Sequence, residues 1–212
     1  MSEGKGGMTT GKHAAVFIYL GLTILVLTIF YPVRNFDFIT YDDHVYVTDN
    51  PSVRKGLTPD SLSWAFRATE AGFWHPLTWI SLMADSHLYR SNPSGYHWTN
   101  LLLHLASTIS IFLLLRWMTG SLWRSAFVAA LFAVHPLNVE PVSWVAARKD
   151  VLSAFFWILT LAAYGYYARG PALSRYGIVV AVFSLGLMAK PTLVAMPVIM
   201  ILIDVWPLGR LR

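Results

Sequence analysis

Residues 14–33 read AAVFIYLGLTILVLTIFYPV, a stretch of 20 residues without a charged side chain. A helix needs about 20 mostly apolar residues to cross the hydrocarbon core of a membrane, so this stretch predicts a first transmembrane span. Lys5 and Lys12 precede it, as basic residues precede the apolar core of a secretory signal peptide. No small-residue cleavage site follows, however, and we interpret the segment as an uncleaved anchor.

Five further apolar runs follow after a long interval, at residues 101–115, 125–134, 151–168, 176–189 and 191–203. Run 176–189 is about 21 Å long as a helix. It crosses only if Arg175 and Lys190 extend their charges to the membrane surfaces, or if neighbouring helices shelter its ends. An alternative fuses the last two runs into one helix kinked at Lys190. We favour two spans, because a lysine at mid-membrane is costly without a partner.

The composition agrees with a membrane protein. Apolar residues make up 56% of the 212 residues and charged residues only 13%, whereas soluble domains carry about 25% charged residues. The net charge of +5 is scattered between apolar runs, which excludes a nucleic-acid-binding patch. The absence of cysteine excludes disulfides, zinc–thiolate sites and thiol nucleophiles. The predicted fold class is therefore an all-α polytopic membrane protein with about six transmembrane helices.

The basic residues predict the orientation through the positive-inside rule. With the N-terminus in the cytoplasm, the inner side carries eight basic residues, namely Lys5, Lys12, Arg116, Arg124, Arg169, Arg175, Arg210 and Arg212. The predicted organisation is a cytoplasmic tail (1–13), a first span (14–33), a large external loop (34–100), five further spans (101–206) and a cytoplasmic tail (207–212).

The external loop is too aromatic for a linker. We expect an amphipathic helix from Ser61 to Glu70 and a second helix from Pro76 through Tyr89. The apolar face of the second helix is expected to carry Leu77, Ile80, Ala84 and Leu88, with Asp85 elsewhere. Both helices are expected to lie along the membrane interface.

An acidic pair, Asp42 and Asp43, follows the first span by a few residues. Adjacent carboxylates can serve as a general base and a partner that orients it. Together with His44 they can also hold a divalent cation such as Mg²⁺ or Mn²⁺. A solvated acidic turn is the simpler alternative, but the position at a membrane edge favours chemistry.

A second polar stretch lies between the third and fourth spans, from His135 to Asp150. We expect a helix that starts at Pro141 and continues into the fourth span. On it, Glu140, Trp144 and Arg148 recur every four residues and would share one face. Such a stripe can bind a sugar and a phosphate, with arginine on the phosphate. The alternative is an interfacial Glu140–Arg148 ion pair beside a membrane-anchoring tryptophan.

Other polar residues near the same membrane surface suggest packing. His97, Asn100 and His104 stand at helical spacing and are expected to bridge helices rather than take part in chemistry. Lys190, between the last two runs, can meet an anionic head group or extend its charge to the membrane surface, and both interpretations stay open.

Five motifs in order resemble one known family. They are residues 41–51 (YDDHVYVTDNP), 74–79 (WHPLTW), 97–104 (HWTNLLLH), the stretch 135–150, and 186–191 (GLMAKP) with 204–210 (DVWPLGR). They resemble the transmembrane and tetratricopeptide-repeat protein O-mannosyltransferases and their bacterial relatives, over nearly everything from Phe36 to Arg210. The resemblance implies the front half of a GT-C glycosyltransferase fold, the N-terminal membrane part of such a protein.

The resemblance also implies an activity. Such enzymes transfer a sugar, here mannose, from a polyprenyl-phosphate donor to an acceptor hydroxyl on protein at the outer or lumenal face. The family's catalytic acidic pair maps onto Asp42 and Asp43, and Arg148 and Lys190 would hold the donor phosphate. The residues expected to support them are His135, Glu140, Trp144, Lys149 and Asp150. The bacterial relatives imply an inner-membrane location, with lipid around the spans.

Family members continue into more spans and repeats, whereas this sequence stops at Arg212. We therefore expect a truncated or partial module: a truncated gene, a fragment, or a short paralogue with only the front of the catalytic module. The remaining spans and repeats are then a candidate partner. Two other function classes stay open: a non-catalytic membrane scaffold that binds a lipid or a partner, and a transporter. A polar cluster at the outer face favours the transferase, and a polar chain at mid-membrane favours transport.

Overall fold

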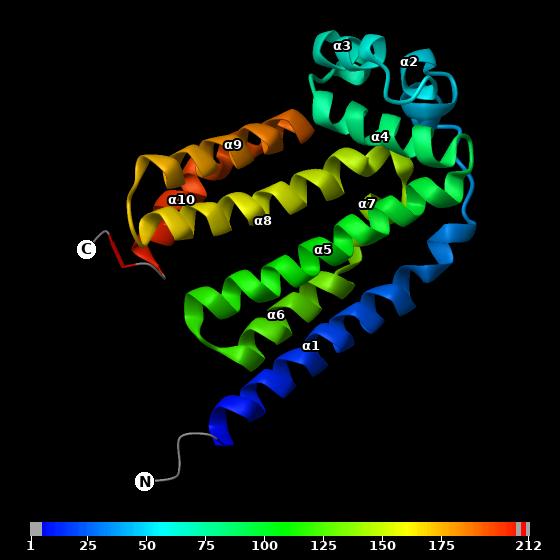
Figure 1. Ribbon diagram of the computed structural model, residues 1–212. Coiled ribbons are helices and arrows are strands. Elements are labelled where there is room, and N and C mark those ends of the chain that lie inside the picture. Colours follow the sequence, from blue (N-terminus) through cyan, green and yellow to red (C-terminus); the bar gives the residue numbers. More distant parts are fainter. Residues whose placement is uncertain (1–5, 207–208, 211–212) are drawn as a thin grey trace.

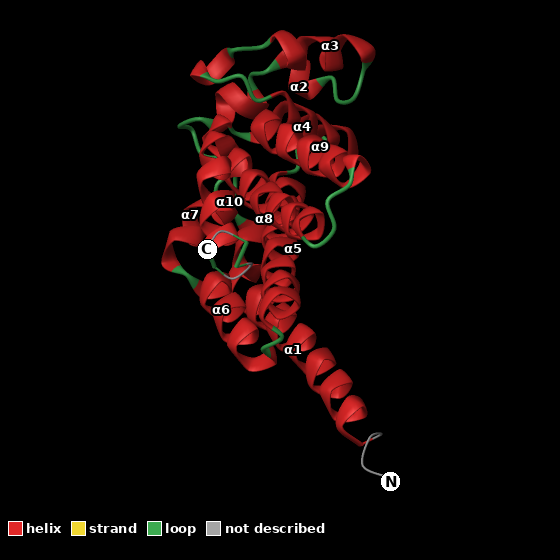
Figure 2. Ribbon diagram, turned by 90° about the vertical axis from the view of Figure 1, so that its left-hand side faces the viewer, coloured by secondary structure: helices red, strands yellow, loops and turns green. Residues whose placement is uncertain are grey.

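The computed structural model describes residues 6–206 and 209–210, and within them every regular element is a helix (Figures 1 and 2). The helices of the bundle are α1 (Gly6–Phe30), α5 (Pro93–Thr119), α6 (Leu122–Val134), α8 (Arg148–Ala168), α9 (Leu173–Ala189) and α10 (Met196–Val205). The helices of the connecting segments are α2 (Pro51–Arg54), α3 (Pro59–Arg67), α4 (Pro76–Tyr89) and α7 (Val139–Ser143). The predicted fold class, an all-α membrane protein, is confirmed.

Helices α2, α3 and α4 cover one end of the bundle (Figure 1). We call these three helices, residues 51–89, the loop layer, and the end that they cover the loop end. Helix α1 begins, and α10 ends, at the opposite end of the bundle. The predicted tails at 1–13 and 207–212 lie partly outside the described residues.

Three helical stretches are long and apolar enough to cross a membrane, namely His13–Asn35, Pro93–Thr119 and Val145–Ala168. A fourth is present if Leu122–Val134 and Pro136–Ser143, which meet at a bend of 52°, count as one span. The apolar stretches Leu173–Ala189 and Pro191–Val205 are shorter. The protein is therefore a multi-pass membrane protein, and the number of six spans stays a prediction.

The chain reverses direction at Lys190, so the alternative of one kinked helix for the last two runs is wrong. Lys190 forms an ion pair with Asp150 at the start of α8. At the other end of the same helix, the Tyr164 hydroxyl donates to Asp204 Oδ2 over 2.6 Å. The segment from 191 to 205 thus runs back along α8, while α9 runs the opposite way (Figure 1).

The first loop helix is shorter than expected and starts earlier. It runs from Pro59 to Arg67 rather than from Ser61 to Glu70. Proline suits the first helical position, and the Thr58 hydroxyl caps the start by accepting from the Ser61 N–H over 3.2 Å. Near its end the Phe66 carbonyl accepts from Trp74 Nε1 over 2.9 Å. Glu70 lies in a separate single turn.

Helix α4 has the expected bounds but buries a different face. Trp79, Leu82 and Met83 are fully buried, whereas Leu88, placed on the expected apolar face, is 69% exposed. The reason is that the loop layer has its own core, in which Trp79 packs against Tyr46. Apolar spacing along one helix could not reveal that core, because its other half comes from a different segment.

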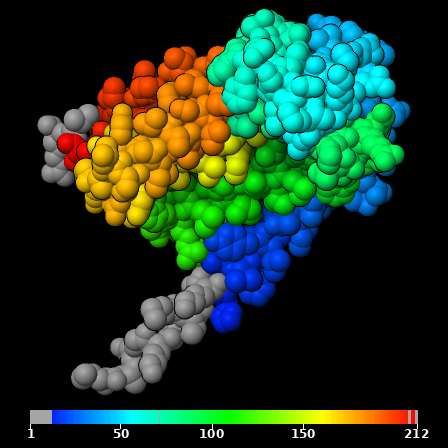
Figure 3. All heavy atoms as spheres, turned by 45° about the horizontal axis from the view of Figure 1, so that its top comes forward, coloured from blue at the N-terminus to red at the C-terminus, as the bar shows by residue number. Residues whose placement is uncertain are grey.

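The loop layer is fixed to the bundle by polar contacts. The Thr78 hydroxyl of α4 donates to the Ala189 carbonyl at the end of α9 over 2.9 Å. Asp85 of the same helix pairs with Arg148 at the start of α8. Seen from above, the cyan residues of the loop layer sit against orange α9 and green α5 (Figure 3). These contacts bring the first loop, the α7–α8 junction and Lys190 to one place.

Candidate functional site

Asp43 joins the first loop to the α7–α8 junction. Its carboxylate is completely buried and accepts two backbone hydrogen bonds, from Ile39 N and from Ala146 N, each over 2.8 Å. Burial raises the pKa of the Asp43 carboxyl, and these two hydrogen bonds oppose the rise because they favour the ionised form. The Asp43 side chain thus connects the first loop to the α7–α8 junction, two segments that lie more than a hundred positions apart in the sequence.

Asp42, the other member of the acidic pair, is partly exposed. Its carboxylate lies within electrostatic range of Asp43 and of the Lys149 ammonium. A turn of π-helix, residues 44–48, follows the pair directly. Such turns are rare and recur at functional sites. Because Asp42 is partly exposed and Asp43 is buried, Asp42 is the member of the pair that a reactant can reach.

Lys149 lies within electrostatic range of both members of the acidic pair. Its ammonium donates to the Ala146 carbonyl over 3.0 Å and lies 4.7 Å from the centre of the Tyr46 ring. The negative charge of Asp150 attracts the Lys149 ammonium, and the positive charge of Lys190 repels it. We call the five residues that gather here the charged cluster: Asp42, Asp43, Lys149, Asp150 and Lys190. Three distant segments supply them.

Buried aromatic rings pack beneath the charged cluster. Tyr46, His75 and Trp79 stack on one another, with ring centres 4.8 to 5.8 Å apart. Burial, followed by the charges of Asp42 and Asp150, raises the pKa of Tyr46 to about 12. Burial, followed by the charge of Lys149, lowers the pKa of His75 to about 4. His75 is therefore neutral at physiological pH, and neither ring nitrogen has a hydrogen-bond partner among the described residues.

The expected stripe of Glu140, Trp144 and Arg148 on one helix does not exist. Helix α7 ends at Ser143, Trp144 is extended with φ −109° and ψ 123°, and α8 begins only at Arg148. The extended geometry at Trp144 turns the three side chains out of register. Glu140 is consequently exposed, and neither the predicted sugar–phosphate stripe nor the alternative Glu140–Arg148 ion pair is present.

Arg148 lies in a polar network inside the protein. Its side chain is 0% exposed, and Nη2 contacts Asp85 Oδ2 at 2.5 Å and the Tyr96 carbonyl at 2.9 Å. Nη1 donates to Ser81 Oγ over 2.8 Å, and Nε donates to Asn100 Oδ1. All of these partners are protein groups, so the geometry does not support the assignment of Arg148 to the donor phosphate.

The packing role expected for the polar residues at the start of α5 is confirmed for two of them. Asn100 Nδ2 donates to the Trp144 carbonyl over 2.9 Å, which fixes the α7–α8 junction. His104 Nε2 contacts the Ala133 carbonyl at 3.1 Å and so joins α5 to α6. His135, predicted to support the site, is exposed and instead accepts from Leu137 N in a local turn.

The residues do not fit the divalent cation considered for Asp42, Asp43 and His44. Within the part of the chain that the structure describes, no three His, Asp or Glu side chains gather to hold a metal ion. Both oxygens of Asp43 already accept backbone N–H groups. His44 is exposed, whereas Asp43 is fully buried.

An apolar groove of about 430 Å³ adjoins the acidic pair. Ile39 and Tyr41, which precede the acidic pair in the sequence, line this groove together with Trp144. Glu140 also lines this groove, whereas Arg148 does not. The groove has the character needed to receive a hydrocarbon chain.

Polar groups deeper in the bundle are satisfied locally. The hydroxyls of Ser107, Thr108 and Thr160 each donate to the carbonyl four residues earlier in their own helix, over 2.7 to 3.0 Å. No ion pair of the described residues involves the middle of α5 or α9. This arrangement disfavours the transporter hypothesis, which needs a polar path across the bundle.

Fold and site together define a multi-pass α-helical membrane protein with a charged cluster at one end of its bundle, beside an apolar groove. Comparison with known proteins agrees with that class. The chain is 28% identical to the protein O-mannosyl-transferase Tmtc1 of Drosophila melanogaster, over 95% of this chain and 24% of that protein. It is 31% identical to Tmtc2 of the same species over 61% of this chain, and 27% identical to mouse TMTC3 over 77%.

The resemblance deduced from the motifs is thereby confirmed: the chain is similar to the TMTC protein O-mannosyl-transferases. It spans about a quarter or less of the length of the curated relatives that it matches. No family model matches the chain. No solved structure matches it either.

Proposed function

We propose that this protein is a membrane glycosyltransferase, which transfers mannose from a polyprenyl-phosphate donor to a hydroxyl of a protein acceptor. The observation that carries the proposal is the charged cluster: an accessible carboxylate, Asp42, lies within electrostatic range of Lys149, which in turn lies within range of Lys190, at the loop end of the bundle. The names of the similar proteins give the reaction class. The loop end then faces outward, and α1 starts in the cytoplasm.

The reaction is a single displacement. Asp42 accepts the proton of the acceptor hydroxyl, whose oxygen attacks the anomeric carbon of the sugar. The bond from that carbon to the phosphate oxygen breaks, and polyprenyl phosphate leaves. Lys149 and Lys190 stand where they can stabilise the negative charge of the phosphate, and the apolar groove beside Trp144 receives the prenyl chain.

The other residues position these groups. Asp43 fixes the acidic turn against Ala146, and Asp150 pairs with Lys190. Arg148 fixes the start of α8, and with it Lys149, against α4 and α5. In this proposal Arg148 takes no part in phosphate binding, and its expected role passes to its neighbour Lys149.

The test is a transfer assay with the chain in liposomes, a polyprenyl-phosphate mannose donor and a serine-containing peptide. Asp42→Asn keeps the size of the side chain but removes the base, so transfer should fall about 10²–10⁴-fold. Asp60→Asn removes an exposed acid from the first turn of α3 and should transfer normally. Normal transfer by Asp42→Asn would show that the acidic pair is structural.

Donor binding separates the enzyme from a scaffold. Lys149→Ala should weaken binding of the polyprenyl-phosphate mannose, with the fold retained, because the ammonium bonds only a carbonyl within its own segment. A chain that binds the donor through Lys149 but transfers no sugar would support the non-catalytic lipid-binding alternative.

A further inference from the structure

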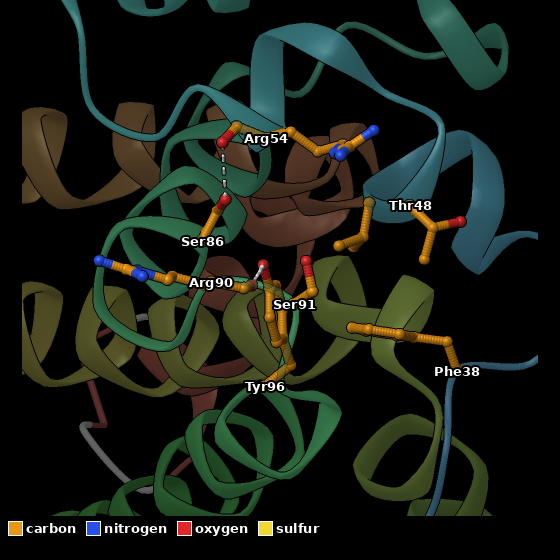
Figure 4. A pocket seen from close by; sticks show the side chains of 8 residues that line it. Phe38, Thr48, Arg54, Ser86, Arg90, Ser91 and Tyr96 are labelled. Carbon is orange, nitrogen blue, oxygen red and sulfur yellow. Dashed lines mark hydrogen bonds between the residues drawn. The ribbon is translucent and has the colours of Figure 1, made fainter.

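A second cavity, of about 370 Å³, lies within the first loop on the other flank of the acidic turn (Figure 4). Phe38 precedes the Tyr41–His44 turn by three positions, and Thr48 follows it by four; both line this cavity. Ile39 and Tyr41 line the apolar groove instead. The acidic pair therefore stands in the sequence between residues that line two different cavities.

Arg54 supplies positive charge to this cavity, which Arg90 also lines. Arg54 is the arginine that we consider as the ligand-binding group. It lies in the last turn of α2, is exposed, and forms no ion pair with any residue that the structure describes. Figure 4 shows its side chain reaching across the cavity toward Thr48. Its own carbonyl accepts from Ser86 Oγ over 3.3 Å, which ties the end of α2 to α4.

A strained turn forms the facing wall. Arg90 ends α4 with φ 55° and ψ −122°, and it is the one non-glycine residue with positive φ among those described. Its carbonyl accepts from the Tyr96 hydroxyl over 2.9 Å, which stabilises this backbone. The turn presents the Ser91 hydroxyl to the cavity, while the Arg90 side chain runs away from Arg54 (Figure 4). Such strain persists where the surroundings enforce it, commonly at functional sites.

The lining selects a ligand with one negative charge. Arg54 offers a guanidinium, Ser91 offers a hydroxyl, and the Phe38 ring offers an apolar wall. Asp49 is close by, because its carboxylate accepts from the Thr48 hydroxyl over 3.3 Å. That negative charge disfavours a dianionic phosphate but permits a carboxylate paired with Arg54. A polypeptide side chain of Asp or Glu has this chemistry.

We infer that this cavity binds the acceptor polypeptide, with an acidic residue on Arg54 and a serine or threonine hydroxyl at Asp42. The inference rests on the proposed function and extends it, because a lipid donor suits the apolar groove and a water-soluble acceptor suits the polar cavity.

The test uses two fluorescent serine-containing peptides that differ only in Asp against Asn, and measures their binding to the detergent-solubilised chain by fluorescence anisotropy. Wild type should bind the Asp peptide about tenfold more tightly, and Arg54→Gln should remove that preference. Arg67→Gln, an equal loss of charge from exposed α3, should keep it. Equal binding of both peptides by wild type, or a preference that survives Arg54→Gln, would overturn the inference.

Two further variants separate this inference from the proposed function. Ser91→Phe fills the cavity and should weaken binding of both peptides, whereas unchanged binding would place the peptide elsewhere. Asp42→Asn should keep the Arg54-dependent preference even if no sugar is transferred. Sugar transfer that is lost in Asp42→Asn but unchanged in Arg54→Gln would refute the acceptor cavity and leave the proposed function intact. Arg54-dependent peptide binding without any transfer would refute the enzyme and leave the cavity intact.

Discussion

Replacing Arg148 by methionine tests whether this arginine holds the fold or holds a phosphate. Its guanidinium is completely buried and donates to four groups, one of them the Asp85 carboxylate at 2.5 Å. Methionine keeps much of the length and packing volume but leaves the Asp85 charge buried without its partner. Removing one member of a buried ion pair typically destabilises a protein by about 3–5 kcal/mol.

The assay is thermal unfolding in detergent, followed by the near-ultraviolet signal of the tryptophans. For a chain of this size 3–5 kcal/mol corresponds to a fall in Tm of about 6–20 °C. Arg67→Met, at an exposed position on α3, should change Tm little. The double variant Arg148→Met with Asp85→Leu should recover much of the loss, because no unpaired charge remains buried.

The contrary result is equally specific. If Arg148→Met unfolds at the wild-type temperature and yet loses binding of the polyprenyl-phosphate donor, the arginine is a phosphate ligand. The hydrogen-bond network between Arg148 and Asp85 would then be dispensable for stability, although Arg148 is buried. If the single variant is destabilised and the double variant is not rescued, packing rather than the unpaired charge accounts for the loss.

Two further predictions concern groups beneath the acidic turn. Asp43→Asn should lower the free energy of unfolding by about 1–3 kcal/mol, since the amide NH₂ cannot accept a hydrogen bond from one of the two buried N–H groups. Asp42→Asn should leave the free energy of unfolding unchanged. Equal stabilities of the two variants in denaturant titration would contradict this prediction. His75 has a pKa lowered to about 4 from 6.5, so the unfolded chain binds the extra proton and stability should fall as the pH drops from 6.5 toward 4. His75→Phe should flatten that dependence, and parallel curves of Tm against pH for the variant and wild type would refute the assignment.

The class of protein, the likeness to a family and the candidate acidic pair can all be predicted from the sequence alone. Long charge-free runs such as 14–33 are too apolar to stay in water. In lipid the backbone polar groups of such a run can be satisfied only if it forms a helix, so composition and run length predict an all-α membrane protein. The ordered motifs gave the likeness to the O-mannosyl-transferases, and the acidic pair drew attention to residues 42 and 43. Each of these deductions depends on residues that are close together in the chain.

Tertiary structure decided which charges meet. A four-residue spacing predicted that Arg148 would join the site, but one extended residue, Trp144, breaks the helix and sends Arg148 inward to Asp85 and Lys149 outward to Asp42. Asp85 looked like the polar side of an interfacial helix, because its partner lies 63 positions further along the chain. Local spacing fixes the direction of a side chain only while a helix stays regular, and the pairing of distant charges depends on how segments pack.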